Sequence, residues 1–198
     1  MYELNAARSV LYGALSLLFV YGAAHKKPED TIAALKAIED SDFDKEACQN
    51  AKLLREALEK EGGFDALGEE FSALFLIPFG EIVPMSASRY YDEQEAGKPL
   101  AIVREILKDC ELIKDSQKFS ENEDNFGFIF ALMSRLNRQS AQGEEQSAIA
   151  AQKLYKEIIN PFAPNFVARL KKNPNVALYS FAVNLLDRFL LFEAEFYS

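Results

Sequence analysis

Three acidic residues stand directly before an apolar helical pattern in the stretch SENEDNFGFIFALMSRL, residues 120–136. Ser120 and Glu123 have the spacing of a capping box, in which the serine oxygen accepts a helix N–H and the glutamate reaches back. Glu121 and Asp124 complement the helix dipole from the same turn. All three carboxylates also suit a cationic ligand, because arginine pairs with a carboxylate through two parallel hydrogen bonds. The residues alone leave helix capping and ligand binding both open.

Residue types that carry catalysis or hold metals are scarce in this chain. His25 is the single histidine, so a histidine-assisted nucleophile or a histidine-rich metal site has one imidazole at most. Cys48 and Cys110 match no metal or redox spacing and are expected to be free thiols in a reducing cytoplasm. No zinc, P-loop, dinucleotide or nucleophile-elbow motif occurs, and nothing selects a carboxylate pair for acid–base work. We therefore predict no catalytic residue, metal or cofactor. Of the possible functional classes, an enzyme is less favoured than a binding protein.

The net charge of the chain indicates which kinds of partner it is suited to bind. The chain carries 31 acidic and 22 basic residues, a formal net charge of −9. This disfavours a nucleic acid or an anionic membrane surface as partner, because both attract cationic side chains. A cationic peptide suits such a protein better, although acidity also serves solubility alone.

One apolar run, residues 10–24, resembles the hydrophobic region of a signal peptide. Glu3 and Arg8 leave the preceding residues without a net positive charge. The run is also shorter than the ~20 residues that a membrane span needs. We predict a buried first helix and no stable membrane insertion.

Helical periodicity dominates the rest of the chain, and no sustained alternation predicts a strand. Pro28 followed by two acids indicates a helix start, and Asn160-Pro161 is expected to end a helix. We predict an all-α protein with eight or nine helices in a single bundle-like domain over residues 1–198. The expected helical segments are residues 3–24, 28–40, 41–63, 64–76, 99–112, 120–136, 144–159, 164–172 and 176–196.

A long connection, FGEIVPMSAS, separates two of these helices at residues 79–88. It is either a plain connection with Ile82, Val83 and Met85 in the core, or a mobile apolar rim that accepts a ligand. Methionine suits adaptable peptide-binding surfaces because it is unbranched and polarisable. Composition favours neither reading.

Several segments, in order, resemble the TorD/DmsD/NarJ family of redox-enzyme maturation chaperones. Residues 121–125, ENEDN, are similar to the family's Glu-Pro-x-Asp-His pattern. Arg8, Tyr12 and Leu15 resemble its first helix. An aromatic-x-x-Leu-Phe-x-x-Pro helix end with a following loop is matched by Phe71, Leu74, Phe75, Pro78, Pro84, Ser88 and Tyr90. The His-x-x-x-Trp-x-Pro-x-Phe signature is matched at Ile158, Phe162, Pro164 and Phe166.

The chain departs from the family pattern at four positions. Asn122 replaces a proline, Asn125 and Ile158 replace histidines, and Phe162 replaces a tryptophan. Asn125 can hydrogen-bond but cannot carry a proton, so we do not expect it to take a pH-sensitive role at that family position.

The resemblance implies a cytoplasmic, non-enzymatic chaperone. Its partner would be a molybdoenzyme precursor, bound through its twin-arginine signal peptide or its body until the cofactor is inserted and export is allowed. Formate dehydrogenase, sulfoxide or amine-oxide reductases and nitrate reductase are candidate clients. The resemblance allows a monomer or a domain-exchanged dimer. The expected peptide-binding residues are Phe75, Pro78, Pro84, Ser88, Tyr90, Glu121, Asp124, Asn125 and Phe162.

We expect Glu123 to cap the helix while Glu121 and Asp124 face outward, beside the loop that holds Pro84 and Tyr90. Carboxylates next to an apolar groove would match the guanidinium groups and the apolar helix of such a peptide. The alternatives are a NarJ-like assembly factor for nitrate reductase, a helical adaptor without chaperone function, and a small-molecule enzyme on a helical bundle.

Overall fold

The computed structural model describes residues 2–77, 81–117 and 119–198. The chain folds into two compact units, each built from two separate segments. Unit 1 comprises Met1–Ser16 and Met85–Pro164, and unit 2 comprises Leu17–Pro84 and Asn165–Ser198. The single domain over residues 1–198 stays a prediction.

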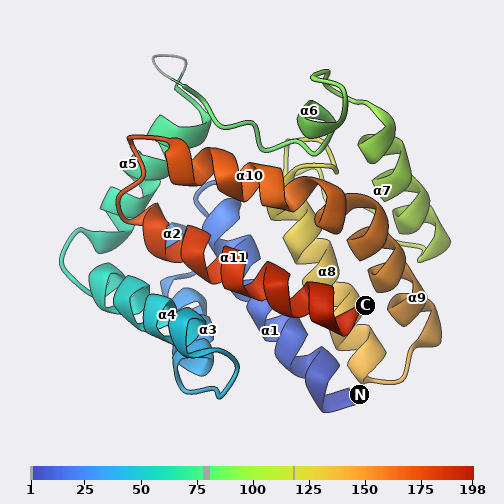
Figure 1. Ribbon diagram of the computed structural model, residues 1–198, viewed down its shortest axis with the longest axis horizontal. Helices are drawn as coiled ribbons and strands as arrows, with labels where there is room; N and C mark the ends of the chain where they lie inside the picture. The colour runs from blue at the N-terminus through green and yellow to red at the C-terminus, as the bar shows by residue number, and fades with distance from the viewer. Residues whose placement is uncertain (1, 78–80, 118) are drawn as a thin grey trace. The chain divides into compact units, whose positions relative to one another are not determined.

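The described residues are helical and contain no strand, which confirms the all-α class (Figure 1). An isolated antiparallel bridge joins Ser86 and Asn125. When the unbroken run α9–η1–α10 is counted once, the described residues form ten helices, eight of them long. Eight long helices agree with the expected eight or nine.

Unit 1 contains the helix α8, of which more than half the residues are buried. This helix packs on α9, which in turn packs on α7. Ser9 of α1 and Ser134 of α8 each donate a side-chain hydrogen bond to the other's carbonyl, both at 2.8 Å. A Cβ on Gly13 would lie 3.2 Å from Oγ of Ser134, so the glycine permits this close approach. The helices with residues in unit 1 are α1 (Tyr2–Phe19), α6 (Ser88–Tyr91), α7 (Lys98–Asp109), α8 (Phe126–Ala141), α9 (Glu145–Leu154), the π-helical η1 (Tyr155–Ile159) and the first turn of α10 (Asn160–Lys172).

In unit 2, α4 lies between α3 and α11 and packs on both (Figure 1). Arg55 of α4 binds Glu39 of α3 at 2.7 Å. A buried aromatic cluster forms the core beside α5, with Tyr179 donating its hydroxyl hydrogen bond to the carbonyl of Leu18 at 2.6 Å. This cluster consists of Phe19, Phe71, Phe75, Phe166 and Tyr179. Besides the end of α1 and most of α10, the helices of unit 2 are α2 (Ala23–Lys26), α3 (Pro28–Glu39), α4 (Lys45–Leu58), α5 (Gly63–Phe75) and α11 (Tyr179–Phe196).

The first helix is buried along one face, as expected, through Leu11, Tyr12, Leu15 and Leu18. It ends at Phe19 rather than at residue 24, because Gly22 adopts a left-handed backbone conformation before α2 begins. Across the described part of the chain, no helix combines the length and hydropathy that crossing a bilayer requires.

The predicted helix end at Asn160-Pro161 is wrong. The chain stays helical from Glu145 to Lys172, with Pro164 inside α10. The π-helical turn η1 directly precedes Asn160. Its wider register displaces the carbonyls that an α-helical turn would aim at a proline ring, so Pro161 fits without a break.

Candidate functional site

The acidic stretch of residues 121–124 lies just before α8 and not within its first turn. The helix begins at Phe126, and Asn125 is its N-cap, with extended backbone angles of φ −67° and ψ 131°. Oδ1 of Asn125 accepts a hydrogen bond from the backbone N–H of Gly127 at 2.9 Å. The predicted capping box is therefore wrong: Ser120 instead donates to the carboxylate of Glu121 at 3.2 Å.

Asp124 holds the loop that precedes α6. Its Oδ2 accepts hydrogen bonds from Oγ of Ser86 at 2.6 Å and from the backbone N–H of Ser88 at 3.1 Å. Its backbone carbonyl accepts from the N–H of Ala87 at 2.8 Å. Phe126 donates its N–H to the carbonyl of Met85 at 2.8 Å, which satisfies a donor that a helix start leaves open. We call residues 85–88 and 124–126 the Asp124 junction.

The side chain of Asp124 is completely buried, with 0% of its surface exposed. Its second oxygen, Oδ1, has no hydrogen-bond partner among the described residues. The expectation that Asp124 faces outward is thus wrong, because its hydrogen bonds draw residues 86–88 to its carboxylate. The expectation that it lies beside the loop before Tyr90 agrees with these hydrogen bonds.

The two glutamates of the stretch differ in accessibility. Oε2 of Glu123 accepts a hydrogen bond from Nε of Arg104 on α7 at 3.1 Å, and Nη2 of Arg104 lies 3.0 Å from the same oxygen in an ion pair. Glu121 is exposed, and its carboxylate takes part in no ion pair within the described ranges. Lys114 donates to the backbone carbonyl of Glu121 at 2.6 Å, so one cation lies near this residue. Of the three acids, Glu121 has the carboxylate that a ligand can reach.

Aromatic side chains continue this region along α6. The ring of Tyr90 lies 5.8 Å from the ring of Phe126, centroid to centroid. The neighbouring Tyr91 is 50% exposed, and its ring lies 6.1 Å from that of the half-buried Phe162. Sequence reasoning missed Tyr91. Its position next to Tyr90 could have indicated a second aromatic residue at this site. Only the fold of the short helix α6 decides which of the two tyrosines is more exposed.

The remaining predicted site residues do not all gather at the Asp124 junction. Ser88 is buried there, and its Oγ accepts from the N–H of Gly97 at 3.0 Å. Pro84 is half-buried and is the last residue of the first segment of unit 2. Phe75 is 8% exposed and belongs to the aromatic core of unit 2. Pro78 lies outside the described residues.

The loop before the junction also contributes to the core of unit 2. Val83 is buried and donates its N–H to the carbonyl of Leu74 at 2.9 Å. Ile82 and Met85 are half-buried. The loop therefore serves as a connection with a buried valine, and its role in binding stays a prediction.

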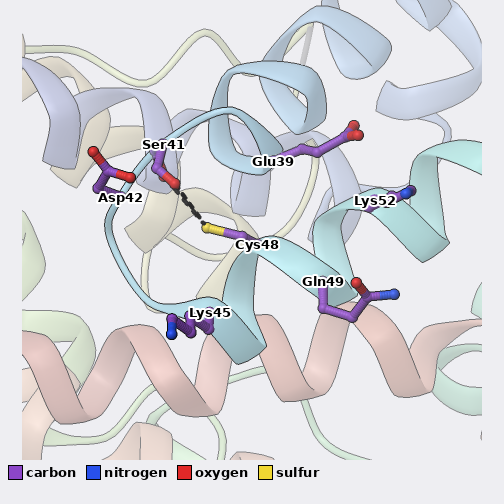
Figure 2. Close-up of a pocket in the computed structure, with 7 residues that line it drawn as sticks. All are labelled: Glu39, Ser41, Asp42, Lys45, Cys48, Gln49 and Lys52. Carbon is purple, nitrogen blue, oxygen red and sulfur yellow. Dashed lines mark hydrogen bonds between the residues drawn. The ribbon is translucent and has the colours of Figure 1, made fainter.

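A separate pocket of about 280 Å³ lies where α3 connects to α4 (Figure 2). Its thiol, Cys48, donates a hydrogen bond to the carbonyl of Ser41 at 3.2 Å. The two acids and two lysines of the lining balance in charge, and the described residues contain no group suited to hold a metal ion. Its lining therefore selects no ligand class. The lining residues are Glu39, Ser41, Asp42, Lys45, Cys48, Gln49 and Lys52.

A comparison with curated proteins finds no significant match. A comparison with protein families finds that the model of the family described as "Nitrate reductase delta subunit" matches residues 40–168. This range covers well over half of the chain, from the turn before α4 into α10, and includes the whole Asp124 junction. It also confirms the predicted resemblance at the level of redox-enzyme maturation chaperones. The chain therefore belongs to the nitrate reductase delta subunit family, which is a family of assembly chaperones and not of catalysts.

Proposed function

We propose that this protein is a cytoplasmic assembly chaperone for a molybdenum-cofactor oxidoreductase. The observation that carries the proposal is the family match over residues 40–168. The described residues include no cluster suited to hold a metal ion, and the lining of the pocket between α3 and α4 selects no ligand class.

We further propose that the client's twin-arginine signal peptide binds beside the Asp124 junction. Such a peptide presents guanidinium groups followed by an apolar, helix-prone stretch. The exposed carboxylate of Glu121 suits a guanidinium group, which pairs with a carboxylate through two hydrogen bonds. The Tyr91–Phe162 pair offers partly exposed aromatic surface to the apolar stretch. Both features belong to unit 1.

A NarJ-like role is the second candidate, and the description of the matched family favours it. In that case the client is a nitrate reductase catalytic subunit, and recognition uses the body of the client or a leader that is not cleaved. The same acidic and aromatic surface serves either client.

Charge reversal tests the site. Glu121→Lys is expected to weaken binding of a twin-arginine peptide by about tenfold and to flatten its salt dependence, because a steering charge is lost. Glu61→Lys is the matched control, since Glu61 is an exposed acid in a turn of unit 2. Both variants should keep the helical circular dichroism signal. Equal affinities for the two variants would remove Glu121 from the site.

Capture of the client tests the function itself. Tagged protein is used to recover partners from native cytoplasm at low salt, followed by mass spectrometry. A precursor with a twin-arginine leader and a molybdopterin domain would support the export chaperone. A nitrate reductase catalytic subunit without a cleavable leader would support the NarJ-like role. Recovery of no oxidoreductase would contradict both.

A further inference from the structure

Three helix starts are connected at Asp124 and Ser88. Ser88, the first residue of α6, donates its N–H to Oδ2 of Asp124. Oγ of Ser88 then accepts from the N–H of Gly97, the N-cap residue of α7. Asp124 itself directly precedes Asn125, the N-cap of α8. Hydrogen bonds through two side chains, those of Asp124 and Ser88, thus link the starts of α6, α7 and α8.

The same carboxylate is out of reach of a partner. Its exposed fraction is 0%, and Oδ2 is already occupied by two donors. A client guanidinium could reach Oδ1 only if the residues that bury it moved away. In this structure Glu121 offers an accessible carboxylate, whereas Asp124 offers none.

The surroundings of Asp124 are also not those that would give the most stable fold. Buried polar atoms are nearly always hydrogen-bonded, whereas Oδ1 has no partner among the described residues. This buried acid is therefore better explained by the loop that its hydrogen bonds hold in place than by a contribution to stability.

We propose that Asp124 is a positioning residue for the client site, an inference that rests on the proposed function. Its hydrogen bonds attach residues 86–88 to the head of α8. They thereby fix the path of the chain into α6, which contains Tyr91. The neighbouring Glu121 is the residue that contacts the client. Asp124 therefore acts on binding through the loop and not through its own charge.

Hydrogen exchange of the free protein tests the hold that Asp124 exerts. Asp124→Ala removes the acceptor and is expected to raise exchange about tenfold at the amides of Ala87 and Ser88. Asp124→Asn keeps a carbonyl oxygen for the two serine donors and should exchange like the wild type. Ser86→Ala removes one donor and should give an intermediate increase, which preserves the test if Asp124→Ala fails to fold. Unchanged exchange in both alanine variants would overturn the inference.

Binding kinetics with a synthetic twin-arginine peptide separate positioning from contact. A loosened loop lowers the binding-competent fraction, so Asp124→Ala should slow association and leave dissociation nearly unchanged. Asp124→Asn should keep the wild-type affinity and salt dependence, because the acceptor and not the charge is needed. Glu121→Gln should instead flatten the salt dependence of association, because a steering charge is lost, and should also speed dissociation, because its contact with a guanidinium is weakened.

One result would assign Asp124 to direct contact and overturn the inference: Asp124→Asn binds as weakly as Asp124→Ala, dissociates faster and has a flatter salt dependence. If the wild type binds no such peptide, the proposed peptide site fails. The exchange experiment still decides, without any client, whether Asp124 holds the loop.

Discussion

At the heads of α4 and α8, different residues cap the backbone N–H groups of the first turn. At α4 the N-cap is Asp44, which accepts from the N–H of Ala47 at 2.8 Å and binds Arg188 through both oxygens, at 3.1 and 2.6 Å. At α8 the cap is the neutral Asn125, and the adjacent Asp124 binds a loop instead of its own helix. The acid at α4 has partners on both oxygens, whereas the acid at α8 has a buried oxygen without one among the described residues.

This difference separates an acid that stabilises a helix from one that shapes a surface. The charge of Asp44 is fully used within unit 2, by its own helix and by α11. The use of a neutral cap at α8 leaves Asp124 available to organise residues 85–88. The comparison predicts that substitutions at the head of α4 reduce stability more, whereas substitutions at the head of α8 reduce client binding more.

The head of α11 extends the comparison and should show the largest loss of stability. Both carboxylate oxygens of Glu70 accept backbone N–H bonds from residues 177, 178 and 179, at 2.7, 2.8 and 2.9 Å. Glu70→Ala should lower the free energy of unfolding by about 2–3 kcal/mol, because these donors lose a charged acceptor. Urea denaturation measures the change. The exposed neighbour Glu69 is the control, and a loss in Glu69→Ala as large as in Glu70→Ala would contradict the assignment.

Removal of the α4 cap should rank second. Asp44→Ala is expected to cost about 1–2 kcal/mol, since the helix loses a capping acceptor and Arg188 loses its partner. Combining Asp44→Ala with Arg188→Ala in a double-mutant cycle separates the cap from the ion pair. Additive losses would show that the ion pair contributes nothing beyond the cap.

The acid at α4 also predicts a pH dependence. The hydrogen bond from Arg188, followed by that from the backbone of Ala47, holds the pKa of Asp44 below its usual value. A carboxyl with a lower pKa in the folded state stabilises the protein above its unfolded pKa and loses that contribution as pH falls. The stability difference between the wild type and Asp44→Asn should therefore shrink below about pH 4. A difference that stayed constant down to about pH 2 would contradict this pairing.

The neutral cap of α8 should contribute less than the charged cap of α4. Asn125→Ala is expected to cost about 1 kcal/mol, the usual loss for an N-cap, while Asn125→Ser keeps an acceptor and should cost a few tenths. Thermal and urea unfolding report the difference. Equal losses in the two variants would mean that the side-chain bond to Gly127 contributes little.

The ion pair between Arg104 and Glu123 should have the smallest effect. The side chain of Arg104 is largely exposed, so Arg104→Ala is expected to change stability by less than about 0.5 kcal/mol. A larger loss would show that the pair helps to hold the residues before α8 and would weaken the special role assigned to Asp124.

The helices themselves could be predicted from the sequence, because their apolar periodicity is local and strong. Pro28 at the start of α3 is an example in which one local signal had no competitor. The helix α4 begins at Lys45 and not at residue 41, because Asp44 is its N-cap although Ser41 and Asp42 also suit a cap. The start of α8 was misplaced because Ser120 and Asn125 both suit an N-cap. The carbonyl of Met85, 41 residues from Phe126 along the chain, receives the first N–H of the helix and thereby favours Asn125.

What the sequence determined by itself is the all-α class, the amphipathic stretches and the acidic character of the segment before α8. Only the tertiary structure decided that Asp124 is buried, that Glu123 pairs with Arg104 and that Glu121 stays accessible. The physical reason is that Asp124 and Glu123 bind hydrogen-bond and ion-pair partners 19 to 38 residues away. Within the described ranges the fold brings no such distant partner to the carboxylate of Glu121. Local pattern records the type of a side chain, whereas the fold determines which partners reach it.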